Sequence, residues 1–215
     1  MNICSWNVRG LNDPNKVGEI KKFVVNNNVR VVAFLKTRVK EQKSKKIQEK
    51  FGSSWSWWTN YEFSPGGESG LAESIIALLF ISFRKLIRRP MWATLNNINS
   101  LNAGPWLVMG DFNLVLVSGD KINGNAVTHS ETVDFEDCLD HAELTEVKSR
   151  GHLFCWYKGH GNNIINCRID RALGNISWHT AYADVVVDYM NPGLSDNTPL
   201  LLSYKVNIPK RGGRS

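Results

Sequence analysis

The first 60 residues alternate between strand-like and helix-like hydrophobic patterns. Residues 1–7 alternate between two faces, and residues 29–35 (VRVVAFL) are rich in β-branched side chains, so both segments are predicted as strands. Between them, residues 15–28 place apolar side chains at helical spacing, at Val17, Ile20, Phe23 and Val24. A strand, a helix and a second strand in this order predict an α/β fold.

A lysine-rich stretch follows the second strand. Residues 40–51 form a predicted helix in which five lysines are interleaved with two glutamates. Such a helix is most often a solvated face, and contact with phosphate groups is the alternative that we retain. Trp55 and Trp57 then alternate in a predicted strand with one aromatic face, where packing into the core is favoured over stacking on bases.

The rest of the chain continues the mixture of helices and strands. Helices are predicted over residues 91–101 and 130–142. Strands are predicted over residues 107–109, 151–157, 162–173, 181–188 and 200–206, and the segments 151–157 and 162–173 form a hairpin through the turn at 159–161. Residues 66–90 carry an apolar run that fits either a buried helix or a strand and shows no clear hairpin.

The composition fits one soluble globular domain. With 215 residues, 42% of them hydrophobic, the chain can bury a substantial core, and nothing demands a second domain. The formal net charge of +6 is compatible with a polyanionic partner. The four cysteines lack the paired spacing of a zinc site and are interpreted as free thiols in a reducing compartment. The apolar residues 75–83 are too few to span a bilayer, which takes roughly 20 residues.

The stretch WLVMGDFN, residues 106–113, is the first candidate for chemistry. Its continuous apolar run predicts a strand buried on both faces. Gly110 is expected to let the backbone turn sharply, so that Asp111 and Asn113 point the same way from the edge of the sheet. The alternative is an ordinary strand-to-loop turn, in which Gly, Asp and Asn are common.

Three other stretches carry polar groups of the kind that phosphodiester hydrolysis requires. Asn7 ends the first strand, Asp170 lies in the run RIDR, and Asp196 lies in the last turn. In metal-assisted phosphoryl transfer to water, carboxylates hold a divalent ion and orient the nucleophile, while amides stabilise the developing charge. Oxygen ligands suit Mg²⁺, which needs only one or two carboxylates. Together with Asp111 and Asn113, these residues form the candidate site.

Four stretches, SWNVRGLN, WLVMGDFN, RIDRAL and LSDNTPL, give the chain a resemblance to the endonuclease/exonuclease/phosphatase superfamily over nearly its whole length. The stretches GHLFCWYKG and RIDRALGN are most similar to the apurinic-type endonuclease domain of plant LINE (non-LTR) retrotransposons. The resemblance implies a four-layered α/β sandwich, in which two mixed β-sheets face each other and helices lie outside. It also implies that the site lies in a cleft at one end of the sheets.

The resemblance further implies a divalent-metal-dependent phosphodiester hydrolase that nicks DNA, with Mg²⁺ as the cofactor. Asp111 would activate the attacking water, and Asn113 would position the water or the scissile phosphate. Asn7 would contact the phosphate or support the metal shell. Asp196 would lie at the metal or beside the catalytic histidine, and Asp170 would orient that histidine.

Two positions depart from the family pattern. Lys36 stands where the family has a metal-binding glutamate, and an ammonium repels a metal ion. Asn197 replaces the histidine of a Ser-Asp-His motif, and an amide cannot exchange a proton near neutral pH. These departures predict a degenerate, catalytically impaired copy. The alternatives are a non-catalytic nucleic-acid-binding relic and a non-functional fragment.

One domain is predicted over residues 1–208, followed by a basic tail at 209–215. Residues 66–90 do not match the family and are interpreted as a deletion junction, so middle strands of the fold are expected to be missing. DNA is the expected partner, and neither a membrane nor a disulfide partner is expected. The chain is expected to be an intracellular monomer, nuclear if it is functional.

Overall fold

The computed structural model describes residues 1–57, 59, 76–80, 85–152, 154–159, 163–191, 193, 195 and 197–204. For residues 76–80 and 85–91 it describes the backbone. The predicted basic tail at 209–215 lies outside the described residues, as does much of the predicted deletion junction. The tail, the junction and the missing middle strands therefore stay predictions.

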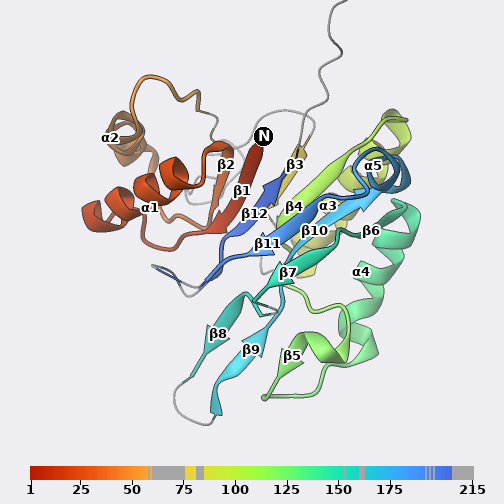
Figure 1. Cartoon of the computed structure of the whole chain (residues 1–215). Helices are drawn as coiled ribbons and strands as arrows, with labels where there is room; N and C mark the ends of the chain where they lie inside the picture. Colours follow the sequence, from red (N-terminus) through yellow and green to blue (C-terminus); the bar gives the residue numbers. More distant parts are fainter. Residues whose placement is uncertain are drawn as a thin grey trace, which may run out of the picture.

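Two β-sheets form the centre of the molecule (Figure 1). The first has the strand order β2-β1-β12-β11-β7 and combines the parallel pair β1–β2 with the antiparallel pair β1–β12. Its strands are β1 (Asn2–Asn7), β2 (Val29–Leu35), β7 (Ser149–Gly151), β11 (Val186–Tyr189) and β12 (Leu200–Ser203). The second, in the order β3-β4-β10-β6, consists of β3 (Ile76–Phe80), β4 (Leu107–Asp111), β6 (Leu144–Glu146) and β10 (Asp170–Asn175).

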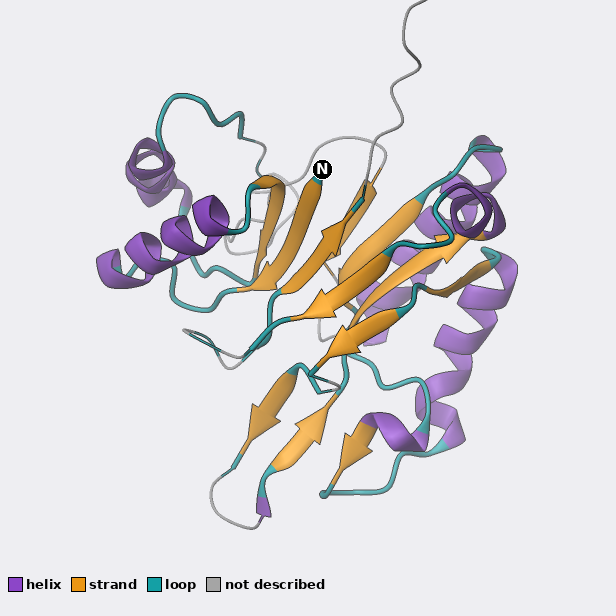
Figure 2. Cartoon of the chain, viewed as in Figure 1, coloured by secondary structure: helices purple, strands orange, loops and turns teal. Residues whose placement is uncertain are grey.

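Helices cover the outer faces of both sheets (Figure 2). The first sheet carries α1 (Pro14–Asn26) and α2 (Glu41–Phe51), and the second carries α3 (Lys85–Leu101) and α4 (His129–His141). The short helix α5 (Ile176–Ala181) follows β10 directly. A small third sheet is built from β5 (Lys121–Ile122), β8 (Trp156–Lys158) and β9 (Ile165–Cys167), with the 3-10 turn η2 (Ser118–Asp120) beside it.

The hydrophobic core is divided into three layers by the two sheets. Along β1, Trp6 packs toward α1 and α2, whereas Ile3 packs between the sheets. Along β4, Leu107 and Met109 pack between the sheets, and Val108 packs toward α3 and α4. Central strands covered on both faces need apolar residues at successive positions, which explains the continuous apolar runs in the sequence. The predicted four-layered α/β sandwich is confirmed.

Two strands predicted from the sequence are each divided in the structure. Residues 151–157 belong partly to β7, which ends at Gly151 with a left-handed φ of 93°, and partly to β8. Residues 162–173 belong to β9 and β10, because the chain crosses between sheets where the Arg168 amide donates to the Asp120 carbonyl at 2.8 Å. The hairpin itself is confirmed, since Trp156 pairs with Cys167 in antiparallel register.

Other predicted boundaries are corrected. Residues 55–57 form no strand, but the rings of Trp55 and Trp57 lie 6.4 and 5.2 Å from the ring of Phe51, so their packing against the core is confirmed. The helix predicted from residue 91 begins earlier, in α3. The strand predicted from residue 181 begins later, in β11, because α5 occupies the preceding residues. Among the described residues, no helix has the length and hydropathy needed to cross a bilayer.

Candidate functional site

Three polar side chains from different strands meet at one end of the space between the sheets. Alternate residues of β1, β4 and β10 pack into the core between the sheets, namely Ile3, Leu107, Met109 and Ala172. The same two-residue period carries Asn7, Asp111 and Asp170 to the inner face at the ends of these strands. Asp111 and Asp170 are direct partners in the antiparallel register.

Asp111 lies at the centre of this cluster and is fully buried. Its Oδ1 accepts a hydrogen bond from the Asn113 amide at 2.8 Å, and its Oδ2 accepts one from Asn7 Nδ2 at 2.5 Å. The prediction of a sharp turn at Gly110 is wrong, because Gly110 lies within β4, opposite Arg171. The chain instead adopts a left-handed conformation at Asn113, with a φ of 49°, which asparagine tolerates better than most residues.

Lys36 reaches the same cluster from the end of β2. Strict alternation would place its side chain with Phe34, which faces the helices, but a left-handed φ of 50° at Lys36 breaks the alternation. Its ammonium donates to Asp111 Oδ2 and to Asn113 Oδ1. Burial raises the pKa of the Asp111 carboxyl, and the Lys36 ammonium opposes that rise. A buried ion pair therefore occupies the centre of the candidate site.

The segment before β12 adds a second amide. Asn197 is fully buried, its Oδ1 accepts from Asn7 Nδ2 at 3.3 Å, and its carbonyl accepts from Trp6 Nε1 at 3.2 Å. Ser195 Oγ donates to the Asn7 carbonyl at 2.9 Å. Asp196, between them, lies outside the described residues. The position that departs from the expected histidine thus lies within one hydrogen bond of Asn7.

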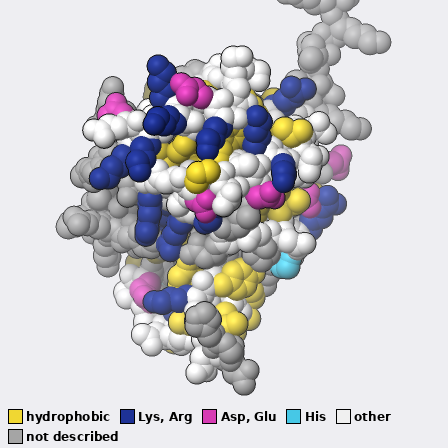
Figure 3. Space-filling view, turned by 90° about the vertical axis from the view of Figure 1, so that its left-hand side faces the viewer, with side chains coloured by type: hydrophobic (Ala, Val, Ile, Leu, Met, Phe, Trp, Pro, Cys, Tyr) yellow, Lys and Arg dark blue, Asp and Glu magenta, His cyan; other side chains and the backbone are white. Residues whose placement is uncertain are grey.

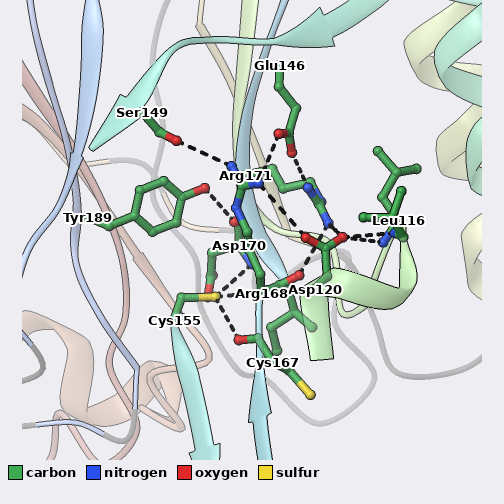
Figure 4. A network of polar contacts seen from close by, with 12 residues as sticks. Leu116, Asp120, Glu146, Ser149, Cys155, Cys167, Arg168, Asp170, Arg171 and Tyr189 are labelled. Atoms are coloured by element: carbon green, nitrogen blue, oxygen red, sulfur yellow. Dashed lines mark hydrogen bonds and ion pairs between the residues drawn. The ribbon is translucent and has the colours of Figure 1, made fainter. Parts of the chain in front are cut away.

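Asp170 is buried and lies opposite Asp111 in the second sheet. Its Oδ2 has no hydrogen-bond partner among the described residues. Burial, together with the negative charge of Asp111, raises the pKa of the Asp170 carboxyl well above its usual range. Its backbone is held firmly, because its amide donates to Cys155 Sγ at 3.1 Å and its carbonyl accepts from Tyr189 Oη at 2.9 Å (Figure 4).

The sequence profile of the endonuclease/exonuclease/phosphatase family matches residues 74–196. This match spans more than half of the chain and includes Asp111, Asn113 and Asp170. The chain belongs to this family. No curated protein sequence matches the chain significantly.

Solved structures in this fold match nearly the whole chain. The 3′ phosphatase NExo from Neisseria, bound to a product DNA hairpin, superposes with a TM-score of 0.72 over 96% of this chain and 100% of its own, at 16% identity. The AP endonuclease LMAP from Leishmania major superposes with a TM-score of 0.69 over 94% of this chain and 86% of its own, at 14% identity. The endonuclease domain of TRAS1, a telomere-specific non-LTR retrotransposon, superposes with a TM-score of 0.60 over 96% of this chain and 99% of its own, at 8% identity. At these identities the likeness establishes the fold.

The divalent metal implied by the family resemblance does not fit the described residues. The Lys36 ammonium contacts Asp111 and Asn113, at the position where the resemblance implies a metal-binding glutamate. Asn7 turns its Nδ2, a hydrogen-bond donor, toward Asp111. Among the described residues, no three His, Cys, Asp or Glu side chains are grouped closely enough to hold a metal ion.

A largely buried charge network lies beside Asp170 and is not predicted from the sequence (Figure 4). Arg171 is 1% exposed and donates to both Asp120 and Glu146. Arg168 lies 3.0 Å from Glu146 and 5.4 Å above the centroid of the Tyr189 ring. The two arginines balance the two carboxylates. The available signal was an arginine within the apolar strand RAL, because a buried arginine requires a carboxylate partner.

Proposed function

We propose that this chain is a retrotransposon-derived, endonuclease-like domain that acts on DNA as its substrate class and whose phosphodiester hydrolysis is impaired. The observation that carries the proposal is the convergence of Asn7, Asp111 and Asn113 with two substituted positions, Lys36 and Asn197. Family membership supports the ancestral chemistry, and the two substitutions support its loss.

The contacts explain why hydrolysis would fail. An attacking water needs a free carboxylate to take its proton, but both oxygens of Asp111 are committed to Asn7, Lys36 and Asn113. A leaving oxygen needs a proton donor or a cation, and the Asn197 amide supplies neither. Asp170 retains its buried position, yet the described residues place no imidazole beside it to be oriented. In this proposal Asn7, Asn113 and Asp196 are the positions to which the family resemblance assigns contacts with the phosphate, the water and the metal shell.

The proposed origin and partner rest on the motifs together with the neighbouring folds. The chain carries GHLFCWYKG and RIDRALGN, the stretches that resemble plant LINE endonuclease domains, and the TRAS1 endonuclease domain shares the fold. Another neighbour is a DNA-bound phosphatase and another is an AP endonuclease, which supports DNA as the substrate class. A protein that acts on chromosomal DNA would work in the nucleus, and we propose that location for a functional copy.

The first test is a nicking assay on supercoiled plasmid, run with Mg²⁺ and with EDTA. We expect the chain to nick no faster than a protein-free control, because loss of one acid-base group alone costs about 10²- to 10⁴-fold in rate. The Asp111→Asn variant serves as the matched control. Nicking that requires Mg²⁺ and disappears in Asp111→Asn would show that the site is active and would overturn the proposed impairment.

A second candidate function, DNA binding without cleavage, is favoured by the distribution of charge. Residues 1–57 contain 12 Lys and Arg against 4 Asp and Glu, whereas the remaining residues contain 14 against 16. Figure 3 shows the face that carries α1 and α2, where many Lys and Arg side chains are exposed. The exposed basic side chains of α1, α2 and their flanking segments are Lys21, Lys22, Arg30, Arg38, Lys40, Lys43, Lys45, Lys46 and Lys50. A basic surface attracts the phosphate backbone of DNA.

Substitution within α2 tests this surface. The double variant Lys43→Gln, Lys46→Gln should bind duplex DNA about tenfold more weakly at low salt, and the slope of log K against log salt should fall by about 2. The matched control is Lys148→Glu, which gives the protein the same net charge as the double variant. Lys148 lies just before β7, away from α2, and its exposed side chain donates a hydrogen bond to the Ala183 carbonyl. Fluorescence anisotropy across a salt series measures both the affinity and the slope for each variant. Equal weakening in the control would mean that α2 makes no specific contribution.

A further inference from the structure

The Lys36 side chain is placed as a fixed component of the site and not as a surface cation. Only 7% of the side chain is exposed, although lysine is among the residues least often buried. Its ammonium contacts the carboxylate of Asp111, at the end of β4 in the facing sheet, and the amide oxygen of Asn113, just after that strand. A left-handed backbone at Lys36 is needed to direct it there. The strained backbone at Lys36 thus brings a positive charge into contact with Asp111 and Asn113.

The oxygens around this charge are arranged for an ammonium. Asp111 Oδ2 accepts from both Lys36 and Asn7, and Asp111 Oδ1 accepts from the Asn113 amide. The one positive charge of Lys36 balances the one negative charge of Asp111, so this pair needs no further cation. A divalent ion at the same point would meet a donor from Asn7 and an ammonium from Lys36. It would have to displace both.

We infer that the Lys36 ammonium is the resident cation of this site and makes the folded site independent of divalent metal. It holds Asp111 and Asn113 in place and balances the buried carboxylate, the two tasks that a bound ion would otherwise perform. The inference rests on the proposed assignment of these residues to the family site, but it does not depend on DNA being the substrate. It predicts that the metal requirement is encoded by one residue and returns when that residue becomes an acid.

Thermal unfolding in EDTA and in Mg²⁺, at matched ionic strength, tests the inference. The unmodified chain should have the same Tm in both. Lys36→Glu should melt lower in EDTA, because the introduced carboxylate and Asp111 then repel each other, and Mg²⁺ should raise its Tm by about 5 to 10 °C at roughly 100 times its Kd. Asn7 Oδ1, which has no hydrogen-bond partner among the described residues, would complete an oxygen donor set in that variant.

The Lys36→Met variant separates the loss of the ammonium from the gain of a carboxylate. It leaves Asp111 buried without its partner, so its Tm should fall, and Mg²⁺ should raise that Tm less than it raises the Tm of Lys36→Glu. If Lys36→Glu fails to fold, titration of the unmodified chain with Mn²⁺, followed by electron paramagnetic resonance, still decides the question. No saturable site is expected there. A saturable Mn²⁺ site, or an Mg²⁺-dependent Tm of the unmodified chain, would overturn the inference, whatever the nicking assay shows.

Discussion

The double variant Lys36→Glu, Asn197→His should nick supercoiled plasmid in the presence of Mg²⁺ at least about 10²- to 10⁴-fold faster than the unmodified chain. The first substitution would remove the ammonium that occupies Asp111 and would supply a carboxylate at the same point. The second would restore a group that exchanges protons near neutral pH. The structure already places position 197 within one hydrogen bond of Asn7, so the imidazole would enter an assembled cluster.

The single variants separate the recovery of metal binding from the recovery of turnover. Lys36→Glu alone should restore metal binding without efficient turnover, and Asn197→His alone should restore neither, because Asp111 remains paired with Lys36. Adding Asp111→Asn to the double variant should abolish nicking. If the double variant folds with the same circular dichroism spectrum as the parent and binds Mg²⁺ but does not nick, the two substitutions are not sufficient to explain the impairment. The predicted junction at residues 66–90 would then be the next region to restore.

Much of this architecture follows from hydrophobic periodicity. The boundaries of β1, α1 and β2 agree with the prediction to within two residues, because each segment is long enough to show its period. The period of two along β1 and β4 also explains why Asn7 and Asp111 share the inner face. The three-residue strands β7, β8 and β9 contain too few positions to reveal where one ends, so each was merged with a neighbour in the prediction.

The central contact of the candidate site could not be obtained from periodicity. The substitution at Lys36 is visible in the sequence by comparison with the family, but alternation would direct its side chain toward the helices. Its contact with Asp111 depends on a left-handed backbone and on a residue 75 positions away. The sequence indicated repulsion of a metal ion. The structure adds that the Lys36 ammonium donates to both Asp111 and Asn113.

The Arg171→Met variant should lose about 3 to 5 kcal/mol of unfolding free energy, because it leaves buried Asp120 without its closest cation and leaves Glu146 paired with Arg168 alone. Asp120 also accepts the backbone amides of Leu116 and Val117, at 2.8 and 3.0 Å, so its charge is tied to the loop that follows the WLVMGDFN strand. Urea denaturation measures the change in unfolding free energy. The effect on stability should exceed that of removing any exposed ion pair in the described part of the chain.

The matched control is Arg150→Met, which removes the same side chain from an ion pair with Asp188 at the surface, where 70% of the arginine side chain is exposed. This variant should unfold at the same urea concentration as the parent, because solvent screens exposed pairs. Adding Asp120→Asn to Arg171→Met should recover part of the lost stability, since the orphaned charge is then removed as well. Equal destabilisation by the two arginine variants would mean that burial does not set the strength of this network. Packing of the Arg171 side chain, and not its charge, would then be what stabilises the end of β10 at Asp170.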